Sequence, residues 1–306
     1  ARKVVLQGLE GYIVSEKNVT IEAAEGLSNF AYNIYAVENI TLKATAGDIV
    51  NTAVLESLKG NVSLTAEQGS VTNGIAGAPT TGDIVALGGN VKLEAFGKDE
   101  HGVGFDVVNY GDIIATGQNP EHAEKSGNIT LSSEYGNVEN YDNFNTVAGS
   151  EAIKYTSTAK HVTEIVKPED GSYNIAAGSI TLSAKEGSVW NDKHQLVALE
   201  NVTLEAKTGM DSFGETIYAG KNINLIATDG NLVNKAKLTS VEGDVSLEAQ
   251  NGTVVNMLSG DILTLGGSVN MHAGQQAEAD HSVYYVDTTN FSENDLKLLN
   301  TLKIGI

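Results

Sequence analysis

Acidic side chains are the most numerous groups in this 306-residue chain that could carry out chemistry, with 39 Asp and Glu against 19 Lys and Arg. A glycosidase needs two carboxylates held about 5–10 Å apart across a cleft. The acids at outward positions of the regular strands, such as Glu94, Glu205 and Glu248, are spread out among hydroxyl side chains. We therefore expect no enzymatic activity, and a carbohydrate-active enzyme remains an alternative.

Metal chemistry finds equally little support in the sequence. The six histidines show no close paired spacing of the kind that metal sites use: His101, His122, His161, His194, His272 and His281. Gly88-Gly89 and Gly266-Gly267 lack the following Gly and Asp of a calcium-binding repeat. The chain has no cysteine, which excludes disulfides and thiolate ligands. We expect no metal and no cofactor.

Aromatic side chains near one long irregular segment suggest binding instead. Five candidate binding residues lie within or beside residues 141–171: Tyr141, Phe144, Tyr155, His161 and Tyr173. Tyrosines on protruding loops are common in recognition surfaces for proteins and sugars. The alternative is that the loops cover the flank of the fold and bury these rings.

The charge balance limits the partners. The net charge is −20, and Arg2 is the only arginine. Nucleic-acid binding needs clustered basic side chains, so we expect none. No run of 18 or more apolar residues exists, so the sequence predicts no membrane-spanning helix.

A nine-residue phrase, Asn-hydrophobe-polar-Leu-x-Ala-x-x-Gly, returns along almost the whole chain. Five of the nine steps between copies are 21 or 22 residues long, which is typical of a coiled β-solenoid. The copies start at Asn18, Asn39, Asn61, Asn90, Asn128, Ser179, Asn201, Asn222, Asp244 and Ser268.

One repeat is enough to predict the coil. In 222–243, Ile223, Leu225 and Ala227 alternate with polar or outward residues, and Asp229-Gly230 then makes a turn. Two further short strands follow before the next repeat. The sequence therefore predicts an all-β, three-sided parallel β-helix of about ten to twelve coils of 21–22 residues with loop insertions.

The period breaks in three successive coils. Extra residues fall at about 74–82, within 97–127 (split between 97–104 and 117–126) and within 141–171. The first and third insertions occupy the same corner, about 10 Å apart, where they can form one platform. Within the third, 153–166 favours a hairpin lying against the shaft. We expect residues 1–278 to form the shaft and 279–306 an irregular segment, either a short helix or a further coil.

Asparagine recurs at a second fixed position, four residues after the turn glycine. We expect a structural ladder of stacked amides, with ligand binding as the alternative: Asn51, Asn73, Asn140, Asn191, Asn234 and Asn256. The Asn-x-Ser/Thr triplets at repeat starts are best explained as by-products of the phrase, although they also match glycosylation acceptors.

Phrases such as GNVSLTAEQGSVTN, GSITLSAKEGSVWN and GDVSLEAQNGTVVN resemble the repeats of filamentous-haemagglutinin-type exoproteins, over roughly residues 18–273. The resemblance implies a right-handed β-helix shaft, secretion or display at the bacterial surface with an outer-membrane secretion partner, and a role in virulence. It implies an adhesin that binds a host-cell surface protein, a glycan or another bacterium. The shaft of a cytolysin or of a contact-dependent toxin carrier, or a pure spacer, are the alternatives.

Overall fold

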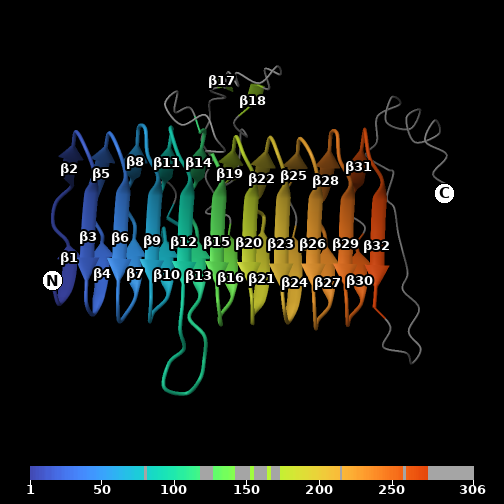
Figure 1. The fold of residues 1–306 in the computed structure, drawn as a ribbon, viewed down its shortest axis with the longest axis horizontal. Helices are drawn as coiled ribbons and strands as arrows, with labels where there is room; N and C mark the ends of the chain where they lie inside the picture. Colours follow the sequence, from blue (N-terminus) through green and yellow to red (C-terminus); the bar gives the residue numbers. More distant parts are fainter. Residues whose placement is uncertain are drawn as a thin grey trace.

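The computed structural model describes residues 1–78, 81–117, 127–141, 152–154, 164–166, 173–213, 216–257 and 260–274. These residues contain strands and no helix. Three parallel sheets of ten strands each stack as ten coils, which confirms the predicted three-sided parallel β-helix. Figure 1 shows the resulting rod: the strands of the near sheet run downward, the chain returns behind them, and each coil advances to the right, as in a right-handed coil.

Each coil gives one strand to each sheet. Sheet C holds the strand of the repeat phrase: β3 (Val19–Ala23), β6 (Ile40–Ala44), β9 (Val62–Ala66), β12 (Val91–Ala95), β15 (Ile129–Ser133), β20 (Ile180–Ala184), β23 (Val202–Ala206), β26 (Ile223–Ala227), β29 (Val245–Ala249) and β32 (Val269–Ala273). Sheet A follows it: β1 (Lys3–Leu6), β4 (Gly26–Asn29), β7 (Ile49–Asn51), β10 (Val71–Asn73), β13 (Val107–Asn109), β16 (Val138–Tyr141), β21 (Ser188–Asp192), β24 (Gly209–Phe213), β27 (Leu232–Asn234) and β30 (Val254–Asn256). Sheet B closes the coil: β2 (Gly11–Ser15), β5 (Tyr32–Ala36), β8 (Leu55–Ser57), β11 (Ile84–Ala86), β14 (Ile113–Ala115), β19 (Tyr173–Ala176), β22 (Gln195–Ala198), β25 (Thr216–Ala219), β28 (Lys237–Ser240) and β31 (Ile262–Thr264).

The core consists of apolar ladders inside the three sheets. On β9, Val62, Leu64 and Ala66 are fully buried, while Ser63 and Thr65 between them point outward. The next strand of sheet C pairs with β9 in register, so Val meets Val, Leu meets Leu and Ala meets Ala. Because side chains alternate across a strand, the repeat phrase alone determines which residues are buried.

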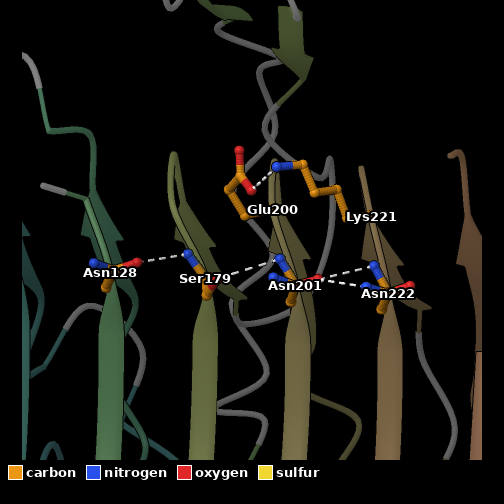
Figure 2. A network of polar contacts seen from close by, with 6 residues as sticks. All are labelled: Asn128, Ser179, Glu200, Asn201, Lys221 and Asn222. Atoms are coloured by element: carbon orange, nitrogen blue, oxygen red, sulfur yellow. Dashed lines mark hydrogen bonds and ion pairs between the residues drawn. The ribbon is translucent and has the colours of Figure 1, made fainter. Parts of the chain in front are cut away.

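The first residue of every repeat forms a polar ladder along the corner between sheets B and C. In each of the nine steps, its side-chain oxygen accepts a hydrogen bond from the backbone N–H of the equivalent residue in the next coil. Figure 2 shows four of these residues, Asn128, Ser179, Asn201 and Asn222. Beside them Lys221 forms an ion pair with Glu200 one coil away.

A second asparagine ladder runs inside the rod at the end of sheet A. Each side-chain amide donates to the side-chain oxygen of the next coil at 2.7–3.0 Å, in six steps. The six asparagines predicted from the spacing all lie in this row. The structure adds Asn29 and Asn109, which are also fully buried.

The inner ladder is interrupted at Ser212, which replaces asparagine between Asn191 and Asn234. Ser212 is fully buried, and its Oγ is the only buried side-chain nitrogen or oxygen among the described residues without a hydrogen-bond partner. An unpaired buried hydroxyl costs free energy because it has lost its water without gaining a partner.

We therefore predict that Ser212→Ala increases the free energy of unfolding by about 1 kcal/mol, since it removes the unpaired hydroxyl with little change of volume. The matched control is Ser240→Ala on β28. Ser240 Oγ accepts from the Gly243 N–H and donates to the Lys221 carbonyl, so this change should lower the stability by a similar amount. Urea denaturation of both variants measures the effect, and a destabilised Ser212→Ala would contradict the prediction.

The insertions lie at the predicted corners. Residues 74–83 connect β10 to β11, and residues 142–172 connect β16 to β19, so both leave the corner between sheets A and B. Within 97–127, β13 and β14 are ordinary coil strands that separate two insertions. The first of these forms a loop with an antiparallel bridge between Lys98 and Gly104, and it projects below the rod in Figure 1.

The hairpin predicted for 153–166 is confirmed at its paired ends. β17 (Ala152–Lys154) pairs antiparallel with β18 (Glu164–Val166), with Ile153 opposite Ile165. The irregular segment predicted for 279–306 lies outside the described residues.

Candidate recognition site

The outward face of sheet A carries a cluster of aromatic and acidic side chains over its middle coils. Val138 and Asn140 of β16 point inward and are fully buried, so Glu139 and Tyr141 point outward. The strand register then places Trp190 of β21 beside Glu139. We call the set of Tyr110, Glu139, Tyr141, Trp190, Asp192 and Asp211 the sheet A patch.

Two tyrosines from neighbouring coils form one side of the sheet A patch. The rings of Tyr110 and Tyr141 are stacked, with centroids 5.5 Å apart and planes 18° from parallel. The Tyr141 hydroxyl donates to Oε2 of Glu139 at 3.0 Å. The stack and the hydrogen bond together fix the ring of Tyr141 and one oxygen of the carboxylate.

Trp190, the only tryptophan of the chain, forms the other side. Its Nε1 donates to Oδ2 of Asp211 in the next coil at 3.2 Å, which fixes the indole. Asp192 lies beside Tyr141 in the strand register. Glu139, Tyr141, Trp190 and Asp192 line a shallow, open hollow in the face of the sheet.

Burial shifts the pKa of one carboxyl of the sheet A patch, that of Glu139, and of the two stacked tyrosines. Burial raises the pKa of the Glu139 carboxyl, and the nearby charge of Asp106 raises it further, against the opposing effect of the Tyr141 hydrogen bond. Burial also raises the pKa of Tyr141, with Glu139 adding to the effect. The six ion pairs among the described residues include none of Glu139, Asp192 and Asp211.

The raised pKa of Glu139 predicts that the stability of the fold depends on pH. A raised carboxyl pKa means that the native state binds the proton more tightly than the unfolded state. The stabilisation from protonated Glu139 is therefore fully present below the ordinary carboxyl pKa, and it is lost as the pH rises through the raised pKa. We predict that Glu139→Gln raises the melting temperature at pH 7 and leaves it unchanged near pH 4.

Melting curves of both proteins between pH 4 and 7 measure this difference. The matched control is Glu205→Gln, which makes the same charge change at an exposed position of sheet C and should shift the melting temperature little at either pH. A lower melting temperature of Glu139→Gln at pH 7 would contradict the prediction.

One buried histidine holds both ends of the longest insertion. His194 is fully buried at the corner between β21 and β22. Its Nδ1 lies 3.2 Å from the carbonyl oxygen of Tyr141, the residue before the insertion, and its Nε2 lies 2.9 Å from Oδ1 of Asn174, just after it. Asn174 is itself fully buried and contacts Asn140 of the inner ladder at 3.5 Å. We call His194 and Asn174 the insertion clamp.

Of the five binding residues predicted from the sequence, the structure places Tyr141 in the sheet A patch. Tyr173 begins β19 in sheet B, on a different side of the rod. Phe144, Tyr155 and His161 lie outside the described residues. Sequence reasoning missed Trp190 as a site residue, although its place between the buried Val189 and Asn191 indicates an outward side chain.

The described residues contain no group of three or more His, Cys, Asp or Glu side chains that could hold a metal ion. In the same ranges there is no helix with the length and apolar character needed to cross a bilayer.

A scan against protein-family models found no match to this chain, and neither did comparisons with curated proteins and with solved structures. The resemblance to filamentous-haemagglutinin-type repeats therefore depends on the repeat phrases themselves.

Proposed function

We propose that this chain is a shaft segment of a secreted or surface-exposed bacterial exoprotein and that it works by binding, with the sheet A patch as its recognition surface. The ligand is a host-cell surface protein, a glycan or a component of another bacterium. In this proposal the chain is an adhesin of the filamentous-haemagglutinin type, exported with an outer-membrane secretion partner and contributing to virulence. The shaft of a cytolysin or toxin carrier would be built in the same way.

The observation that carries the proposal is the composition of one face at one level of the rod. Equivalent outward positions of sheet C carry mainly hydroxyls and scattered charges, whereas sheet A gathers two tyrosines, the only tryptophan and three carboxylates within four neighbouring coils. Aromatic rings with a polar handle are enriched at interfaces. The sheet A patch also adjoins the start of the 142–172 insertion in the chain, since Tyr141 is the last residue before it.

The test is binding to host cells and to a glycan array by the chain and by Trp190→Thr, which gives the patch an outward residue typical of the other strands. The control is Tyr12→Thr, which removes an exposed ring from the stacked pair Tyr12–Tyr35 in the first coil. We expect Trp190→Thr to lose binding and Tyr12→Thr to keep it. If neither the chain nor its variants bind, the segment is a spacer.

One observation favours the alternative function, a carbohydrate-active enzyme. Glu139 and Asp192 line the same hollow from adjacent coils, and the raised pKa of Glu139 suits a general acid. Among the described residues the hollow is shallow and open and does not enclose a polymer, which favours binding as our conclusion. Release of reducing ends from plant or bacterial polysaccharides, lost in Glu139→Gln, would favour the enzyme instead.

A further inference from the structure

We propose that the hollow between Glu139, Tyr141, Trp190 and Asp192 binds a guanidinium group, the arginine side chain of a partner protein. This inference rests on the proposed function, because it names the chemistry that the sheet A patch would recognise.

The walls of the hollow supply both interactions that a guanidinium makes. Glu139 and Asp192 provide a carboxylate from each of two adjacent coils, and Tyr141 and Trp190 provide aromatic rings. A planar guanidinium stacks on aromatic faces and donates two parallel hydrogen bonds to a carboxylate. The Tyr141 hydroxyl occupies Oε2 of Glu139, so in this proposal Glu139 accepts one ligand hydrogen bond through its other oxygen and Asp192 accepts the remaining ones.

Three of the four side chains of the hollow, Glu139, Tyr141 and Trp190, are held in place before a ligand arrives. The Tyr110 ring supports the Tyr141 ring, and Asp211 accepts from the indole nitrogen of Trp190. A ligand therefore meets aromatic rings whose rotamers are already fixed, which lowers the entropic cost of binding.

Charge favours a cation over the other ligand classes. Elsewhere on the rod, Glu67, Glu186 and Glu200 are paired with lysines of a neighbouring coil. Glu139 and Asp192 take part in none of the ion pairs of the described residues, and Asp106 adds a further negative charge next to Glu139. The net charge of −20 attracts a basic partner and repels sulfated or sialylated glycans.

The chain already contains a pairing of cation and ring. The ammonium group of Lys98 lies 4.3 Å from the centroid of the Tyr135 ring, a cation–π contact at the base of the 97–104 loop. In the hollow the rings are accompanied by carboxylates, which adds hydrogen bonding to the same attraction.

The experiment titrates the whole chain with capped Gly-Arg-Gly peptide and, in parallel, with the citrulline peptide, whose side chain has the same shape without the charge. Trp190 is the only tryptophan, so its fluorescence reports binding at the hollow directly. We expect saturation with the arginine peptide and none with the citrulline peptide. Glu139→Gln and Asp192→Asn should each weaken binding about tenfold, because each removes a charge-assisted hydrogen bond. The control Glu205→Gln should bind as the unmodified chain does.

Equal binding of the citrulline peptide, or unchanged binding by both hollow variants, would overturn the inference. The same variants separate it from the proposed function. If Trp190→Thr loses binding to cells while the arginine peptide fails to bind, the recognition surface stands and the guanidinium assignment falls. If the peptide binds and Trp190→Thr still adheres to cells, the recognition role falls and the guanidinium site stands.

Discussion

Replacing Asn140 by alanine should lower the free energy of unfolding by about 4 kcal/mol, the largest effect we expect from a single change within the inner ladder. Asn140 donates to Asn191 at 2.8 Å and accepts from Asn109 at 2.8 Å and from Asn174 at 3.5 Å. All four side chains are fully buried. Removing the amide leaves buried polar atoms on both neighbouring coils without a partner and opens a cavity, and both effects destabilise the native state.

Urea denaturation measures this change, and Asn61→Ala is its control. Asn61 belongs to the corner ladder, is exposed, and accepts one backbone N–H, from Asn90. Water can replace that acceptor, so we expect a loss below about 1 kcal/mol. If both variants lose the same stability, the inner ladder adds nothing beyond an ordinary exposed hydrogen bond.

Replacing His194 by alanine should destabilise the insertion clamp, with an expected loss of about 3–5 kcal/mol. The change removes the contacts with the Tyr141 carbonyl and with Asn174, and it empties the volume of a fully buried ring. Because both contacts are made at the ends of the 142–172 insertion, we expect the loss of order to be greatest in β16 and β19. Tyr141 should then lose its fixed position in the sheet A patch.

Hydrogen exchange of the backbone amides measures the effect strand by strand. Protection should fall first in β16 and β19 and remain in the first coils, such as β5. His101→Ala is the matched control, because the His101 side chain is 77% exposed and should leave the exchange pattern unchanged. A uniform loss of protection along the rod would show that His194 is an ordinary core residue.

The repeat phrase predicts the fold well because several residue types can occupy each position of the corner ladder. Each first residue of a repeat needs only an oxygen that accepts the next coil's N–H, and Asn, Asp and Ser all supply one. Variant copies of the phrase therefore remain recognisable. The inner ladder needs a donor and an acceptor on the same side chain, so asparagine recurs there. Two of its asparagines were not predicted because their distance from the turn glycine differs from the usual four residues. Asn109 lies five residues after Gly104 and Asn29 three after Gly26, instead of four.

The sheet A patch could not be predicted in the same way. Tyr110, Tyr141 and Trp190 become neighbours only through the coil register, which carries across the insertions: Asn109 bonds Asn140 over 31 residues and Asn140 bonds Asn191 over 51. The sequence indicates that each of these residues points outward. It does not indicate that irregular loops leave the strand register unchanged. The insertion clamp was missed for a related reason, since His194 takes a corner position that Ala53 and Ala236 occupy in other coils.

The interrupted inner ladder has a mechanical consequence. The hydrogen bonds of all three sheets run along the axis of the rod, so a pulling force between its two ends loads the coil boundaries in series. Six steps of the inner ladder add a buried side-chain bond to the backbone bonds, whereas Ser212 provides none. At the two boundaries of the coil that contains β24, the load is therefore carried by the backbone bonds and by outward side-chain contacts such as that of Trp190 with Asp211, so part of the sheet A patch itself bears tension.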